Sequence, residues 1–148
     1  MTKFKFKLES LLNVRKKLED NLKNELGKAI QVLEHEKDLL CVLEKEMDEC
    51  RRDLGMAFNG KITVEEIKKY NLYIDVISTK IKAQKDRVNK ARNYVDKIRE
   101  ELLKVVKDRQ ILEKYKEKKY SDYIGELAKE EQKTNDEITS YKFAKANV

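Results

Sequence analysis

The chain has 148 residues, of which 42% are charged, and it contains neither Trp nor Pro. Its mean hydropathy of −0.80 is too low for a compact globule built around a large apolar core. Without Pro, and with only four Gly, little in the sequence forces a helix to stop or kink. A composition of this kind also occurs in disordered chains, but the regular spacing of the apolar residues argues against disorder. We therefore predict a single domain of long helices spanning residues 1–148.

The cysteines and the absence of an apolar stretch predict a soluble, cytoplasmic protein. Cys41 and Cys50 are nine residues apart, which on a helix is about 14 Å and too far for a disulfide. No apolar run approaches the roughly 20 residues that a membrane span requires. The start of the chain, MTKFKFKLESLL, lacks the hydrophobic region and cleavage site of a signal peptide.

The first predicted helix covers about residues 5–55 and carries one apolar seam, because apolar residues recur there at alternating steps of three and four. The seam positions are Leu8, Leu12, Arg15, Glu19, Leu22, Leu26, Ala29, Leu33, Glu36, Leu40, Leu43, Met47, Cys50 and Leu54. Three of these, Arg15, Glu19 and Glu36, are polar. Polar seam residues cost stability but often set the register of a coiled coil.

The break after this helix carries typical turn and capping residues. Gly55 stands where a glycine usually follows a helix end, and Asn59-Gly60 is typical of a turn. Thr63 can cap the next helix, while Glu66, three residues later, can complete a capping box. So short a connection makes the two helices antiparallel neighbours.

A second, longer helix is predicted over about residues 64–142, after a turn at about 56–63. Its seam keeps a 3.5-residue repeat and consists of Ile67, Tyr70, Ile74, Ile77, Ile81, Gln84, Val88, Ala91, Val95, Ile98, Leu102, Val105, Arg109 and Leu112. So narrow a seam needs a partner helix, and residues 5–55 supply one. We predict an all-α fold, a long two-helix antiparallel coiled-coil hairpin whose second helix projects beyond the first. Such a chain can fold as a monomer.

Beyond Leu112 the strict repeat breaks, and two interpretations stay open for residues 113–142. The apolar residues there are Tyr115, Tyr120, Tyr123, Ile124, Leu127, Ile138 and Tyr141. On a projecting helix such a tyrosine-rich stripe would be a docking surface. Alternatively, the alternating Lys and Phe residues of segment 3–7 cover part of the stripe.

The charge is unevenly distributed along the chain. Residues 1–24 carry 7 basic and 3 acidic groups, residues 25–79 carry 8 and 12, and residues 80–109 carry 11 and 5. Antiparallel pairing would bring the two basic segments to the same end. Asp86 and Asp96 interrupt the second basic segment, which offers no reading helix or aromatic platform, so we do not expect nucleic-acid binding.

No constellation of catalytic or metal-binding residues is evident. His35, the single histidine, lies between Glu34 and Glu36 and is expected on a solvated surface. One His with two distant Cys does not match the ligand spacing of a zinc site. Neither G-x-x-x-x-G-K-[ST] nor G-x-G-x-x-G occurs. We therefore predict a protein that is not an enzyme and uses no cofactor or metal.

Three segments together resemble the FliJ family, small cytoplasmic proteins of the bacterial flagellar type III export apparatus. They are FKFKLESLLNVRKKLED at the start, GKITVEEIKKYNLYIDVI at the turn, and DRQILEKYKEKKYSDYIGELAKEEQKTNDEI near the end. The resemblance rests on their arrangement, with a start of the form F-x-F-x-L-x-x-L-L-x-x-R and a Gly-x-Ile-Thr turn near residue 60.

The resemblance implies partners and interaction residues. Members of the family are similar to the stalk of rotary ATP synthases. They are associated with assembly of the hexameric export ATPase, with the cytoplasmic part of the membrane export gate, and with export chaperones. The resemblance therefore also implies that the protein lies at the inner face of the membrane and is held there only through its partners. The positions matching the family's gate-contact stripe are Tyr73, Ile77, Lys80 and Gln84, and a second surface matches Leu39, Leu43, Glu46 and Cys50. Tyr73, one step off the seam, is the strongest single candidate.

The resemblance also implies a mechanism without covalent chemistry, in which a basic end of the coiled coil enters the ATPase ring. The expected ring contacts are Arg87, Lys90, Arg92, Arg99, Tyr120, Tyr123 and Leu127. The alternative is a structural or tethering coiled coil of another assembly, with no ATPase partner. The sequence does not say which end enters the ring, whether the coiled coil rotates or which chaperones bind.

Overall fold

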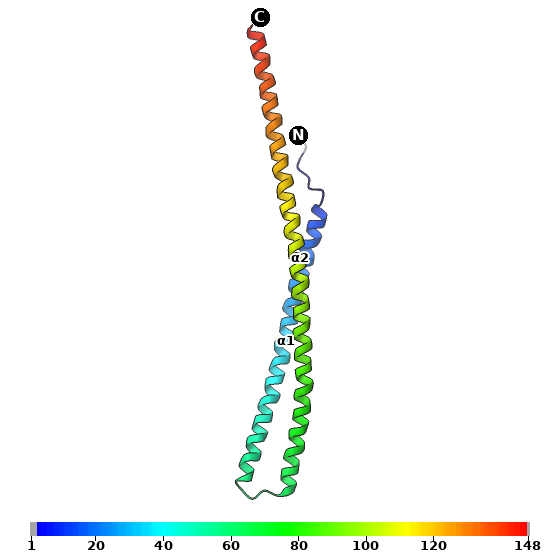
Figure 1. Cartoon of the computed structure of the whole chain (residues 1–148), viewed down its shortest axis with the longest axis vertical. Helices are drawn as coiled ribbons and strands as arrows, with labels where there is room; N and C mark the ends of the chain where they lie inside the picture. The colour runs from blue at the N-terminus through cyan, green and yellow to red at the C-terminus, as the bar shows by residue number, and fades with distance from the viewer. Residues whose placement is uncertain (1–2, 148) are drawn as a thin grey trace. The chain divides into compact units, whose positions relative to one another are not determined.

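The computed structural model describes residues 3–147 of the chain. This part forms two helices and no strand, α1 (Glu9–Phe58) and α2 (Val64–Ala146), which run antiparallel and pack against each other (Figure 1). The predicted all-α fold, two packed helices with a longer second one, is confirmed. Neither helix combines the length and apolar character that crossing a membrane demands, as judged over the described residues.

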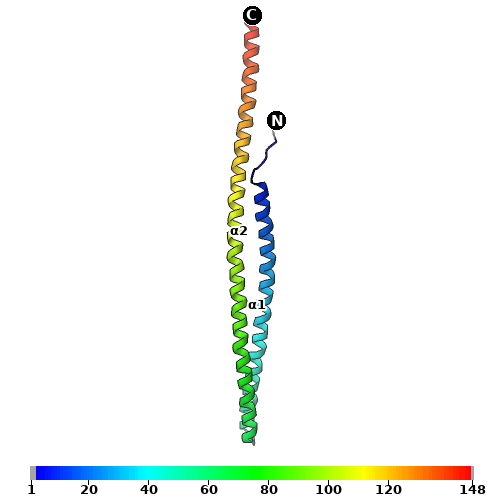
Figure 2. The same ribbon diagram turned by 90° about the vertical axis from the view of Figure 1, so that its right-hand side faces the viewer.

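The contacts between α1 and α2 fall into two units. The terminal unit combines the residues up to Glu19 with those from Lys104 onward, and the turn unit is Asp20–Leu103. Within the turn unit, α1 and α2 run next to each other and are joined by the turn in Figure 1, and α1 lies behind α2 near the turn in Figure 2. Within the terminal unit, α2 continues past the N-terminal segment, and every residue from 128 to 147 is exposed.

The pattern of burial reproduces the predicted seams. Every predicted seam position on α1 and α2 is buried or partly buried, whereas Leu8, the predicted seam position in the turn just before α1, is 37% exposed. In the turn unit Met47, Cys50 and Ile77 form a buried cluster against which Tyr70, Ile74 and Ile81 pack. The two helices therefore pair along the stripe that the 3.5-residue apolar repeat predicts.

The start of α1 differs from its predicted position at about residue 5. Residues 3–6 are not helical, residues 7–8 form a turn, and α1 begins at Glu9. In an extended segment, side chains two residues apart point the same way, whereas on a helix they diverge by about 200°. The extended conformation therefore lets Phe4 and Phe6 face α2 together. Glu9 in the first turn also suits the positive end of the helix dipole.

The end of α1 also differs from the prediction. Gly55 does not end the helix, which continues to Phe58, and no described residue has a positive φ. Instead, the backbone N–H of Asn59 donates to Met56 O at 3.1 Å, and that of Gly60 donates to Ala57 O at 3.2 Å. These short-range bonds satisfy carbonyls at the helix end without a left-handed glycine.

The predicted cap of α2 is present. The backbone N–H of Glu66 donates to Thr63 Oγ1 at 3.3 Å, and that of Ile67 donates to Thr63 O at 3.2 Å. Ile62 and Ile67 are both partly buried beside the cap, as a hydrophobic staple requires. These contacts fix the residue at which α2 begins, after the turn has reversed the direction of the chain.

Replacing Gly27 with Ala is expected to raise the free energy of unfolding by about 1 kcal/mol, because glycine in a helix interior costs that much. A Cβ added at Gly27 would meet no heavy atom within 4 Å, so the methyl group needs no rearrangement. Urea unfolding followed by circular dichroism measures the gain. A loss of stability would show that Gly27 serves a close approach of the backbone.

Candidate functional site

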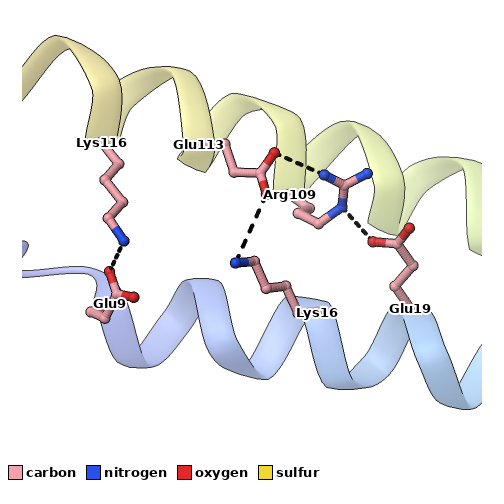
Figure 3. A network of polar contacts seen from close by, with 6 residues as sticks. All are labelled: Glu9, Lys16, Glu19, Arg109, Glu113 and Lys116. Carbon is pink, nitrogen blue, oxygen red and sulfur yellow. Dashed lines mark hydrogen bonds and ion pairs between the residues drawn. The ribbon is translucent and has the colours of Figure 1, made fainter.

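The terminal unit is held by a chain of charged side chains that joins α1 to α2 (Figure 3). Arg109 donates from Nε to the Glu19 carboxylate and from Nη1 to Glu113 Oε2 at 2.8 Å. The same Glu113 carboxylate lies 4.0 Å from Lys16 Nζ. Glu19 is buried, so its charge requires a partner that stays in place. The hydrogen bond from Arg109 to Glu19, and then that to Glu113, raises the pKa of the guanidinium above its ordinary value.

A second polar pair lies in the seam of the turn unit. Gln84 is buried, and its side-chain amide donates both to the backbone carbonyl of Glu36, at 2.9 Å, and to the Glu36 carboxylate. In the described part of the chain no buried side-chain polar atom lacks a partner. The polar seam residues thus connect specific positions of α1 and α2, which is the arrangement that sets register in coiled coils.

The predicted contact residue Tyr73 lies on the surface of the turn unit. Its side chain is 48% exposed, and its hydroxyl donates to Glu46 Oε1 across the two helices. This hydrogen bond raises the pKa of the Tyr73 phenol above its ordinary value, because ionisation would place two negative charges side by side. A shallow hollow lined by Glu66, Lys69, Tyr70 and Tyr73 adjoins the ring. Tyr73 is therefore an aromatic ring available at the surface and held in position from α1.

The other residues of the two predicted gate-contact surfaces divide between the surface and the seam. Lys80 and Leu39 are exposed, whereas Leu43 and Glu46 are partly buried. Three members of the set lie in the core, and these are Ile77, Gln84 and Cys50 at 1%, 7% and 5% exposed. These three side chains occupy the seam that joins the helices and are not exposed at the surface.

The predicted ring-contact residues Arg87, Lys90, Arg92 and Arg99 are all exposed on α2 within the turn unit. Arg99 Nη1 lies 3.8 Å from Asp96 Oδ1, and both side chains are more than half exposed. Surface pairs of this kind contribute little to stability. These four residues, hereafter the basic tract, can therefore contact an acidic partner without any change in the seam.

The N-terminal segment partly covers Tyr115, Tyr120 and Tyr123 of the terminal unit, as the second interpretation of this stripe expects. The Phe4 ring lies 5.2 Å from the Tyr120 ring and 5.5 Å from the Tyr123 ring, centroid to centroid. The Phe6 ring lies 5.8 Å from that of Tyr115. Tyr120 remains half exposed, and Tyr123 and Leu127 are partly buried. The alternation of Lys and Phe in the sequence indicated this contact, because in an extended segment it places the Phe4 and Phe6 rings on the same side.

Some exposed apolar residues of the turn unit lie outside both predicted surfaces. Val32 and Tyr94 are 53% and 52% exposed and line a hollow with Ala29 and Ala91. Leu72 and Val76, next to Tyr73 in the sequence, are 66% and 50% exposed. The sequence could have indicated these residues, because they are apolar but do not fall at seam spacing.

The residues considered for metal or redox chemistry lie apart from one another. Cys41 is exposed, Cys50 is buried, and both are free thiols. His35 is exposed. Over residues 3–147, no group of three or more His, Cys, Asp or Glu side chains is arranged to hold a metal ion.

Comparison with known proteins gives one match. A sequence model of the family described as Flagellar FliJ protein matches residues 4–147. Searches of curated proteins and of solved structures gave no match. The family match includes both helices, the turn and the N-terminal Phe residues. The chain therefore belongs to the flagellar FliJ family and is a component of the flagellar protein export apparatus.

Proposed function

We propose that the chain is a stalk-like, non-enzymatic subunit that binds the hexameric export ATPase and promotes its assembly and activity. In the same proposal it links the ATPase to the cytoplasmic part of the export gate and to export chaperones. The observation that supports this most strongly is the family match over residues 4–147, on a chain that forms two long packed helices. The proposed location is the cytoplasmic face of the membrane at the flagellar base, reached through these partners.

Two surfaces are proposed to divide this work. The exposed Arg87, Lys90, Arg92 and Arg99 would contact acidic surfaces of the ring by charge, and such contacts weaken as salt concentration rises. Tyr73 would contact the gate as an aromatic anchor, a residue type that often dominates interface energetics. Its hydrogen bond to Glu46 restricts the ring before binding, and this lowers the entropy lost on association.

Affinity purification from a flagellated bacterium tests the ATPase link. A tagged chain, captured at low salt and again at high salt, is expected to recover the flagellar export ATPase, with less recovered at high salt. A variant in which all four basic residues are changed to Gln should recover less of the ATPase. Failure to recover the ATPase even at low salt would contradict the proposal and favour a structural tether of another assembly.

Replacing Tyr73 with Ala is expected to weaken binding to the purified cytoplasmic part of the gate about tenfold, as loss of one aromatic anchor typically does. Helicity and the melting temperature should stay unchanged, because Tyr73 is off the seam and 48% exposed. Binding measured by calorimetry and swimming on soft agar report the effect.

Tyr94→Ala is the matched control, since Tyr94 is 52% exposed on the same helix of the same unit. It should bind the gate like the unmodified chain. Tyr73→Phe separates the ring from its hydroxyl and should retain most of the affinity. If Tyr73→Ala melts the helices, or if Tyr94→Ala weakens binding equally, the assignment of Tyr73 is wrong.

A further inference from the structure

The N-terminal segment of residues 3–7, hereafter the strap, lies on a stretch of α2 that α1 does not reach. Beyond Leu112 the strict apolar repeat has ended, but Lys116, Tyr123 and Leu127 of α2 are still partly buried. Lys116 pairs with Glu9, the first residue of α1, so past Lys116 the partner of α2 is no longer a helix. The strap thus occupies the place where a helix would otherwise pack along the seam.

Within residues 3–147, the contacts described for the strap are mainly between aromatic rings. Its anchors are the Phe4 and Phe6 rings on Tyr115, Tyr120 and Tyr123. Among the described residues its one backbone–backbone hydrogen bond joins Glu9 N–H to Phe6 O at 3.2 Å. Aromatic pairs of this kind each add only a modest free energy beyond the area that they bury. Such a segment can leave its site without unfolding either helix.

The strap also covers its site incompletely. Tyr115 and Tyr120 remain 43% and 50% exposed beneath it. A hollow of about 340 Å³ opens beside the strap and is lined by Phe4, Lys5, Phe6, Lys7, Leu8, Tyr115 and Lys119. A packed helix would bury more of these rings than two phenylalanines do, and so has apolar area to gain by replacing the strap.

The stripe is basic at its start, around Tyr115 and Tyr120, whereas Asp122 and Glu126 lie farther along it. Residues 114–119 read KYKEKK, four lysines against one glutamate, and hence carry a net charge of +3. Lys116 pairs with Glu9 at 2.8 Å, and Lys119 Nζ lies over the Tyr115 ring. Lys114, Lys118 and Lys119 are exposed and form no ion pair within the described part of the chain. An occupant flanked by carboxylates would match these charges.

We propose that the strap is an intramolecular competitor for an acidic amphipathic helix of a partner protein. The strap covers the stripe from Tyr115 to Tyr123 in the isolated chain and leaves when a helix with apolar residues at seam spacing, flanked by Glu or Asp, takes its place. The stripe is thereby protected from non-specific association until such a partner arrives. This inference does not depend on which component of the export apparatus supplies the helix.

The test uses the full chain and a fluorescein-labelled peptide with leucines at alternating steps of three and four and glutamates between them. The variant Phe4→Ser with Phe6→Ser, which releases the strap, is expected to bind this peptide about tenfold more tightly than the unmodified chain. The control variant, Tyr141→Ser with Phe143→Ser, loses two aromatic rings that are 69% and 71% exposed. It should bind like the unmodified chain, as measured by fluorescence anisotropy.

Three results would overturn the inference. The first is equal affinity of the strap variant and the unmodified chain for the peptide. The second is equally tight binding of a peptide of the same composition with scrambled leucines, which would mean attraction by charge alone. The third is dimerisation of the strap variant in light scattering, with no dissociation by the peptide, which would make a second copy the occupant.

A second measurement separates release of the strap from misfolding. Acetylation of tyrosines by N-acetylimidazole, read by mass spectrometry, should speed up at Tyr115, Tyr120 and Tyr123 in the strap variant. The rate at Tyr94, in the turn unit, should not change. Unchanged rates at the three tyrosines would show that the strap does not cover them, and faster acetylation at Tyr94 as well would indicate general loss of structure.

Discussion

Replacing Ile77 with Ala is expected to lower the free energy of unfolding by about 2–5 kcal/mol, the range for large-to-small substitutions in a core. Ile77 is 1% exposed and forms the buried cluster of the turn unit with Met47 and Cys50. The loss combines the apolar area of the side chain with the cavity left behind, since a narrow seam has few neighbours that could fill it. Urea unfolding followed by circular dichroism measures the effect.

Val76→Ala is the matched control because Val76 precedes Ile77 on the same helix but is 50% exposed. Its effect should stay within about 0.5 kcal/mol, as for most surface substitutions. Equal effects of the two substitutions would contradict the seam described here. A small effect of Ile77→Ala on stability, together with weakened gate binding, would instead return Ile77 to the contact surface that the family resemblance suggested.

Replacing Arg109 with Met is expected to be the most destabilising change in the terminal unit. It would leave the Glu19 carboxylate buried without the guanidinium that now donates to it. A buried charge that loses a hydrogen-bonding partner costs far more than the pair itself contributes, because the charge has lost its hydration. The urea midpoint should therefore fall.

Two further variants separate loss of the pair from loss of charge in general. Lys116→Met removes a pair with Glu9 whose side chains are 37% and 43% exposed, and it should shift the midpoint much less. The double variant Glu19→Leu with Arg109→Leu should regain most of the stability, since two apolar residues fit the seam. If the double variant is as unstable as Arg109→Met, the cost does not come from the bond that the buried Glu19 carboxylate has lost.

The seams could be predicted from the sequence because burial in a two-helix coiled coil depends on spacing alone. Positions such as Val95 and Ile98, at 1% and 2% exposed, follow directly from the 3.5-residue repeat. The same reasoning failed at Gly55, where the residue type suggested a helix end. A glycine in an uninterrupted helix costs about 1 kcal/mol, which neighbouring turns can offset, so α1 continues to Phe58.

The surfaces were less predictable than the seam. The family resemblance placed Ile77 and Gln84 among gate contacts, although the heptad count had already assigned them to the seam, where the structure finds them. The bond from Tyr73 to Glu46 joins residues 27 positions apart, which only the pairing of the helices brings together. The cover of Tyr120 by Phe4 likewise depends on where α1 begins. Contacts that depend on helix ends need the structure.

The most direct test of the proposed role is a titration of the chain into the purified, monomeric flagellar export ATPase. Mass photometry would follow the fraction of hexamers, and phosphate release would follow ATP hydrolysis in the same samples. The account predicts that both rise together and level off near one chain per ring. Hexamer formation and hydrolysis that stay unchanged at a large molar excess of the folded chain would contradict it.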